Sequence, residues 1–299
     1  MTRKDPIRII EVGERLLERL SACDLCPHEC GIDRTAKETG QCGMTDALTT
    51  ASCNLHHGEE PPLSGTYGSG TIFLSGCSLA CLYCQNYPIS QQRVGSVMTI
   101  KDMAAKMLDL QGRGAHNINF VTPDHFIGHI VKAIGLAVAD GFSIPIVSNS
   151  SGWQKLETVR RLEGIIDIFL VDMRYSNDEI ARNCSGALRY KEVNRAAVKE
   201  MFRQVGNLTF DGAGIARQGV LIRHLVLPGG RSGSAEIFNF LAEELSPEIY
   251  VSLMSQYFPA YKAVDHPDLS RRIKRTEFDK AVDLFYNAGL KNGYIQRME

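Results

Sequence analysis

The spacing of apolar side chains changes twice along the chain. Residues 6–20 carry apolar side chains at helical spacing with charged residues between them, which predicts an amphipathic helix. Residues 21–68 lack this periodicity and are rich in Cys, Gly, Pro and His, which predicts a loop-rich module. From residue 69 onward, short apolar runs alternate with longer segments of helical periodicity. This alternation predicts a series of βα units.

The alternating region predicts about six βα units. Strands are expected at 71–75, 117–121, 144–147, 165–171, 219–227 and 249–253, and helices at 99–113, after Pro123, and at 152–163, 176–184, 188–205, 233–245 and 276–288, with 207–216 as an exposed loop. Strands that alternate with helices form a parallel sheet with right-handed crossovers. We therefore expect an α/β fold, a partial (β/α)6 barrel over 69–299, preceded by an N-terminal helix and a small loop-rich cysteine module over 1–68.

Length and composition exclude several classes of protein. With 299 residues, 44% of them hydrophobic, the chain can bury a large core without disulfide bonds. The net charge of -1 gives no overall positive field that would attract nucleic acid. The one dense basic run, 271–275, is either a solvated turn and helix start or a binding site for an acidic partner. Residues 1–20 are too charged for a signal peptide, and no run of about 18 apolar residues is present to span a membrane. A cytoplasmic protein is expected.

The cysteines are concentrated in the first third of the chain. Eight of the nine lie between Cys23 and Cys84, and only Cys184 falls outside. Because the cytosol keeps thiols reduced, this clustering indicates metal binding. Three of them follow the first predicted strand in the order Cys77-x3-Cys81-x2-Cys84, at the edge of the sheet where βα loops build active sites. Three thiolates on a cubane cluster leave one iron open, where a substrate or cofactor can bind.

This cysteine motif, within 76–86 and with Tyr83 before the last cysteine, resembles the radical S-adenosylmethionine (SAM) superfamily. The resemblance implies that Cys77, Cys81 and Cys84 hold a 4Fe-4S cluster whose open iron chelates the methionine portion of SAM. It also implies that an electron, supplied by a protein such as flavodoxin or ferredoxin, splits SAM to a 5′-deoxyadenosyl radical that abstracts hydrogen. Tyr83 is counted among the cofactor-binding candidates. The alternative for these cysteines is a zinc knuckle or a set of buried thiols.

Polar residues after the second and third strands are further candidates. Thr122, Pro123 and Asp124 stand where the family commonly has a Gly-Gly-Glu that contacts the methionine amino group. This chain lacks those glycines, and the resemblance then assigns the contact with the methionine amino group to Thr122. Ser148 and Asn149 end the third strand and are either contacts to the ribose hydroxyls or a polar helix cap.

A closer resemblance, to the pyruvate formate-lyase activating enzyme branch, rests on 169–174, 177–180, 184–186 and 222–229. By that resemblance Asp172 lies near the cofactor or a bound cation, and Arg174 and Arg223 pair with the cofactor's carboxylate. A guanidinium can grip a carboxylate with two parallel hydrogen bonds. Alternatively, Asp172 and Arg174 pair with each other. His224 is either a proton donor or a satisfied core residue.

The N-terminal module contains a second set of four cysteines, Cys23, Cys26, Cys30 and Cys42. Four thiolates in a loop-rich segment match a closed site that holds either zinc or an auxiliary iron–sulfur cluster. Substitutes or additional ligands are Cys53, His28, His56 and His57. With the segment 57–65, this module resembles a less characterised group related to the activating enzymes. In that segment, Glu59 and Glu60 form either a substrate lid or a link between module and barrel.

The expected function is that of a radical SAM enzyme acting on a protein or a small molecule, with installation of a glycyl radical as the named candidate. The partner is then a glycyl radical enzyme or another protein substrate. Two alternatives stay open: a radical enzyme that modifies RNA or a peptide, and a non-catalytic metal-binding protein. The balanced charge disfavours nucleic acid as a partner.

Overall fold

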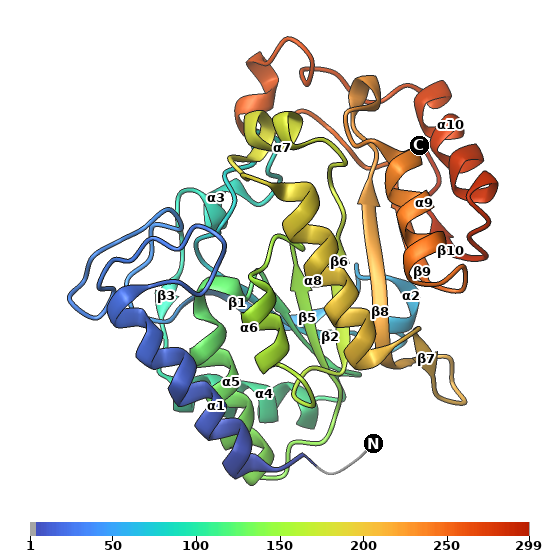
Figure 1. Ribbon diagram of the computed structural model, residues 1–299. Helices are drawn as coiled ribbons and strands as arrows, with labels where there is room; N and C mark the ends of the chain where they lie inside the picture. Colours follow the sequence, from blue (N-terminus) through green and yellow to red (C-terminus); the bar gives the residue numbers. More distant parts are fainter. Residues whose placement is uncertain (1–3, 299) are drawn as a thin grey trace.

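The computed structural model describes residues 4–298, and these contain one ten-stranded sheet (Figure 1). The strands are β1 (Thr49–His56), β2 (Ser69–Leu74), β3 (Ser96–Val97), β4 (Ile118–Val121), β5 (Ile146–Ser150), β6 (Ile168–Asp172), β7 (Thr209–Phe210), β8 (Ala216–Leu225), β9 (Tyr250–Met254) and β10 (Asn292–Ile295). Their order is β10-β9-β8-β6-β5-β4-β2-β1-β3, with β7 paired to β8. From β2 to β10 neighbouring strands run parallel, as the βα pattern predicts.

Helices connect the parallel strands and cover the sheet. They are α1 (Pro6–Glu18), α2 (Pro61–Ser64), α3 (Tyr87–Ser90), α4 (Ile100–Gly112), α5 (Ile127–Ala139), α6 (Leu156–Arg161), α7 (Asp178–Ser185), α8 (Tyr190–Val205), α9 (Ser234–Glu244) and α10 (Arg275–Asn287). Thr99 caps α4 as predicted, because its hydroxyl accepts the backbone N–H of Asp102 while the Asp102 carboxylate accepts that of Thr99.

Helix α1 packs directly on α5, at one side of the molecule in Figure 1. Glycines permit this close approach. A Cβ on Gly13 would lie 2.6 Å from the backbone nitrogen of Lys132, and one on Gly128 would lie 2.9 Å from that of Leu17. The predicted amphipathic helix is therefore an integral layer of the barrel wall.

Four of the described strands, β1, β3, β7 and β10, escaped the sequence prediction. Strand β1 falls within 21–68, where a loop-rich module was expected, and β10 follows the last predicted helix. Strand β1 is antiparallel to β2 and partly exposed, and β10 is a four-residue edge strand beside β9, so neither is a continuous apolar run. The expected loop 207–216 also contains a strand, since β7 pairs with β8.

The sheet curves around one cavity without closing. Phe73 of β2 and Tyr294 of β10 line the same cavity, although their strands are far apart in the sheet order. Strands β3 and β10 end that order on opposite sides within the described residues. A small apolar core of Leu63, Val147 and Leu221 lies on the concave side. The predicted α/β partial barrel is confirmed. Among residues 4–298, no helix has the length and apolar character needed to cross a bilayer.

Candidate functional site

A cavity of about 820 Å³ lies at the carboxyl ends of the parallel strands. Cys77, Cys81 and Cys84 all line it, from the loop that follows β2. The loop turns at Gly76, whose φ of +82° and whose contact with Met44, 2.4 Å from where a Cβ would stand, exclude any side chain. The local sequence therefore delivers three thiols to one wall of one cavity.

Hydrogen-bond donors lie next to all three sulfurs. The backbone N–H of Leu79 donates to Cys77 Sγ at 3.3 Å, and the Ser90 hydroxyl lies 3.1 Å from Cys84 Sγ. Burial raises the pKa of the Cys77 and Cys84 thiols above the ordinary range. Buried thiols of this kind become thiolates when a metal cation replaces the proton.

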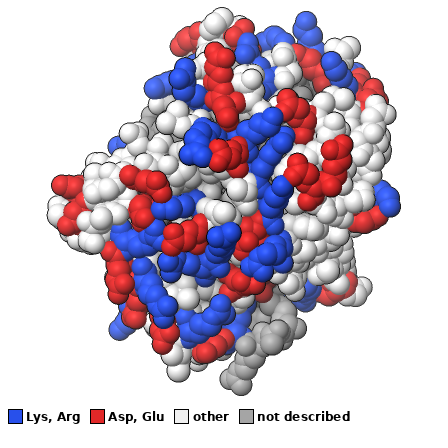
Figure 2. Space-filling model, in the orientation of Figure 1, with Lys and Arg blue, Asp and Glu red and all other residues white. Residues whose placement is uncertain are grey.

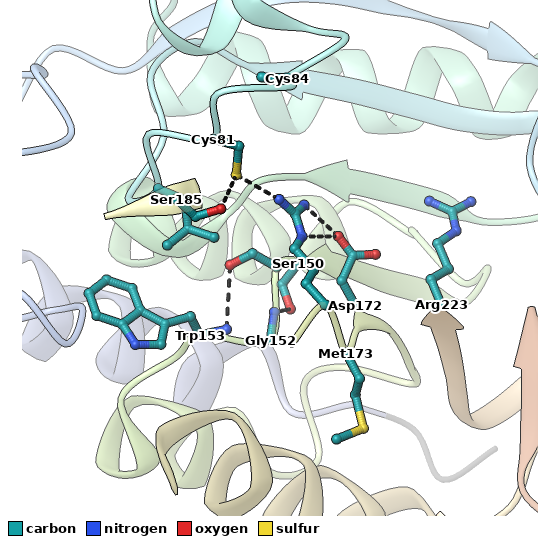
Figure 3. A network of polar contacts seen from close by, with 12 residues as sticks. Cys81, Cys84, Ser150, Gly152, Trp153, Asp172, Met173, Ser185 and Arg223 are labelled. Atoms are coloured by element: carbon teal, nitrogen blue, oxygen red, sulfur yellow. Dashed lines mark hydrogen bonds and ion pairs between the residues drawn. The ribbon is translucent and has the colours of Figure 1, made fainter. Parts of the chain in front are cut away.

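Cys81 has the most strongly polar surroundings of the three. Arg174 Nη1 lies 2.9 Å from its sulfur, and the Ser185 hydroxyl lies 3.0 Å away (Figure 3). Nε of the same guanidinium donates to Asp172 at 2.9 Å. Of the two arrangements left open by the sequence, the structure thus contains the Asp172–Arg174 pair, positioned against a cysteine.

Arg223 is held by carboxylates that sequence reasoning did not connect to it. Its Nε donates to Glu60 at 2.7 Å, and its Nη2 donates to Glu59 at 2.5 Å and to Glu60 at 2.7 Å. Both glutamates line the cavity, while Leu63 of the same segment is buried in the small core on the concave side. The segment 58–65 therefore lies inside the barrel.

The other predicted site residues lie in different places, some in the main cavity and some outside it. Thr122 and Asn149 line the cavity, and Thr122 has a left-handed φ of +58°, which is strained for a β-branched residue. Ser148 does not line it, because neighbours on a strand point to opposite faces; its assignment as a ribose contact stays a prediction. Tyr83 lines a smaller neighbouring cavity of about 160 Å³. His224 is a core residue between the Met173 carbonyl and Ser234.

The N-terminal cysteines lie in the loops before β1. Burial, with the negative fields of Asp124, Cys42 and Cys23, raises the pKa of the Cys26 thiol to about 12. Burial raises that of Cys42 too, with contributions from Cys23 and Cys30. Cys26 and Cys42 thus each lie within the electrostatic field of other cysteines of this set.

The other candidate ligands of this module have neighbours outside the set of four cysteines. Cys53 is on β1, opposite Ile72, where Lys106 is the charge that acts on it. His56 lines the main cavity, and His57 lies beside Gly68. His28 is in the module, but its Nε2 lies 2.7 Å from the Ser78 carbonyl. Within residues 4–298, no three His, Cys, Asp or Glu side chains surround one metal-ion position, so both ligand sets stay predictions.

The residues around Cys77, Cys81 and Cys84 fit an iron–sulfur cluster in chemistry. A cubane binds each thiolate to a different iron, so its ligands surround a cluster and not a single ion. The donors on all three sulfurs, one of them cationic, match the outer-shell hydrogen bonds that such thiolates accept.

Comparison with known proteins agrees with this chemistry. Residues 71–215 match the family model described as the radical SAM superfamily. This stretch, just under half of the chain, is therefore similar to a radical SAM superfamily domain. Such domains belong to enzymes that use a 4Fe-4S cluster, SAM and an external electron donor.

Similarity extends beyond the radical SAM domain. An uncharacterized protein of Methanocaldococcus jannaschii is 29% identical over 286 residues, 92% of this chain and 76% of that protein. The FeFe-hydrogenase maturase HydG of Carboxydothermus hydrogenoformans superimposes with a TM-score of 0.52 at 16% identity, over 77% of this chain. The chain spans 53% of that maturase, and at this low identity the likeness shows the fold alone. A radical SAM methyltransferase of Sphaerobacter thermophilus has a TM-score of 0.47 at 14% identity, over 76% of this chain and 66% of its own.

Proposed function

We propose that this protein is a radical SAM enzyme that cleaves SAM reductively and abstracts hydrogen from a protein or small-molecule substrate. The observation that carries the proposal is the convergence of Cys77, Cys81 and Cys84 on one wall of the cavity, inside the matched domain. These cysteines would hold a 4Fe-4S cluster, which supplies the electron for the cleavage.

The other cavity residues suit the binding of SAM. Arg174 and Asp172 lie beside Cys81, where they would meet the amino and carboxylate groups of the methionine portion. Thr122 and Asn149, at the ends of β4 and β5, are placed to contact the rest of the cofactor. Arg223 with Glu59 and Glu60 occupies the inside of the barrel and helps to keep water from a radical.

The finer assignments extend the same proposal. The candidate reaction is installation of a glycyl radical in a protein partner. A protein such as flavodoxin or ferredoxin would supply the electron, and the reaction would take place in the cytoplasm. The N-terminal module, 1–68, would bind zinc or a second iron–sulfur cluster through Cys23, Cys26, Cys30 and Cys42. Metal and sulfide contents of the wild type are compared with those of a variant that lacks these four thiols. Loss of zinc in the variant indicates a zinc site, and loss of iron and sulfide indicates a second cluster.

The test is formation of 5′-deoxyadenosine. The full chain is reconstituted with iron and sulfide under anaerobic conditions, then given dithionite and SAM. We expect product from the wild type and none from the Cys77/Cys81/Cys84→Ala triple variant. Cys53→Ala is the matched control, because Cys53 lies outside the cavity, and it should behave as the wild type. A wild type that holds its cluster and yields no product would overturn the proposal in favour of a non-catalytic metal-binding protein.

A further inference from the structure

Three buried hydroxyl groups form a line that ends at the sulfur of Cys81. The Tyr83 and Tyr175 hydroxyls are hydrogen-bonded to each other, the Tyr175 hydroxyl lies 2.6 Å from Ser185 Oγ, and Ser185 Oγ lies 3.0 Å from Cys81 Sγ. All four side chains are buried. Figure 3 shows Ser185 directed at the Cys81 sulfur, on the side opposite Asp172.

The chemistry of the last member fixes the direction of every hydrogen bond in the line. A thiolate bound to iron has no proton and only accepts. Ser185 must therefore donate its single proton to Cys81 and accept from Tyr175. Tyr175, having donated, accepts from Tyr83. Each proton thus points toward the sulfur, and hydrogen bonds aligned in this way polarise one another.

The backbone holds Ser185 in this position. It is the last residue of α7, which ends at Gly186 with a left-handed φ of +69°. The carbonyls of Cys184 and Ser185 accept the N–H groups of Leu82 and Ala80, at 2.8 and 2.9 Å. The end of α7 is therefore bonded to the cysteine loop on both sides of Cys81.

We propose that Ser185, Tyr175 and Tyr83 are positioning residues that raise the reduction potential of the cluster held by Cys77, Cys81 and Cys84. Uptake of one electron from the reductant adds negative charge to the cluster and its thiolates. Donors aimed at a thiolate stabilise that charge, and hydrogen bonds to sulfur are among the factors that set these potentials. The inference rests on the proposed function, because it requires that the cluster binds.

The experiment is a potentiometric titration of the reconstituted full-length protein. Dithionite supplies one electron per cluster, and the EPR signal of the reduced cluster is followed. We expect the midpoint potential to become more negative in Ser185→Ala, less so in Tyr175→Phe and least in Tyr83→Phe, as the lost hydroxyl lies further from the sulfur. The matched control is Ser232→Ala, a buried serine whose hydroxyl accepts the Leu227 N–H; it should titrate with the wild type.

Each outcome decides the question. If all three variants titrate with the wild type, the inference is wrong and the proposed function stands. If Ser185→Ala fails to assemble its cluster, the tyrosine variants decide, since phenylalanine keeps the edge-to-face packing of Tyr83 on Tyr257 and of Tyr175 on Tyr190. A wild type that binds no cluster overturns both the proposed function and the inference.

Discussion

Asp124 illustrates how burial alone can set the chemistry of one residue. Its carboxyl is near enough to Cys26 of the N-terminal module to affect that thiol, and it accepts a hydrogen bond from Ser78, the residue after Cys77. The Gln154 amide donates to one oxygen at 2.5 Å, and the Ser78 hydroxyl donates to the other at 3.4 Å. Burial nevertheless raises its pKa to about 7, because two hydrogen bonds do not replace the lost water.

This raised pKa predicts how stability depends on pH. An unfolded Asp titrates near 3.8, so between about pH 4 and pH 7 the folded protein keeps a proton that the unfolded chain has lost. The free energy of unfolding therefore falls as the pH rises through this window and stays lower above it. Asp124→Asn removes the titration and keeps the oxygen that Gln154 needs. We expect the variant to exceed the wild type in stability by roughly 4 kcal/mol at pH 8, and by less than half of that at pH 5.

Urea unfolding of both proteins without oxygen, from pH 5 to pH 8, measures this difference. The buried histidines His125, His129 and His224, whose pKa values burial lowers, contribute equally to both proteins and cancel. Asp140→Asn, at an exposed position, is the control and should show no such trend. A stability difference that stays the same at every pH would refute the argument.

Among the elements, the contact between β8 and the segment 58–65 determines how the cavity is filled. Arg223 of β8 binds Glu59 and Glu60 with all three side chains largely removed from water. Removing one partner of a buried ion pair leaves the other charge uncompensated, which costs more than the pair itself contributes. The stability of this part of the barrel is therefore sensitive to Arg223.

We expect Arg223→Met to lower the free energy of unfolding by roughly 3–5 kcal/mol, because two carboxylates stay buried without a cation. The matched control is Arg203→Met. Arg203 also binds two carboxylates, Glu163 and Glu200, but its own side chain and that of Glu163 are exposed to water, and the buried Glu200 also accepts a hydrogen bond from Gln204. Chemical denaturation should therefore leave the Arg203 variant close to the wild type. Equal losses in the two variants would show that burial does not govern the Arg223 cluster.

The sequence predicts elements better than it predicts contacts between them. The runs that became β4, β6 and β8 are apolar and bounded by helical periodicity, so their pattern is visible locally. The cysteine motif is equally local. In contrast, Arg223 and Glu60 are 163 residues apart, and Ser185 and Cys81 are 104 apart. These partners meet only because the βα units wind into a barrel that brings their ends together, and no local spacing records that geometry.

At the scale of the whole molecule, the distribution of charge bears on the class of substrate. The chain has 33 Lys and Arg residues against 34 Asp and Glu residues. Figure 2 shows both signs interspersed over the face that carries α1, α6 and α8. Ion pairs such as Arg203–Glu163 and Lys191–Glu236 account for part of this mixture. A surface of this kind lacks the single-sign field that draws a protein onto a phosphate backbone.

We therefore expect the protein not to bind RNA through its surface charge. Nonspecific binding to polyphosphate is electrostatic and weakens steeply with salt, because each contact releases counterions. Filter binding of the anaerobic full-length protein to a mixed tRNA pool should show no retention at 50 mM salt, in contrast to a basic RNA-binding protein run beside it. Retention that falls between 50 and 200 mM salt would instead favour the RNA-modifying enzyme. The slope of that decline would count the phosphate contacts, and charge reversals such as Lys191→Glu and Arg195→Glu would then locate them.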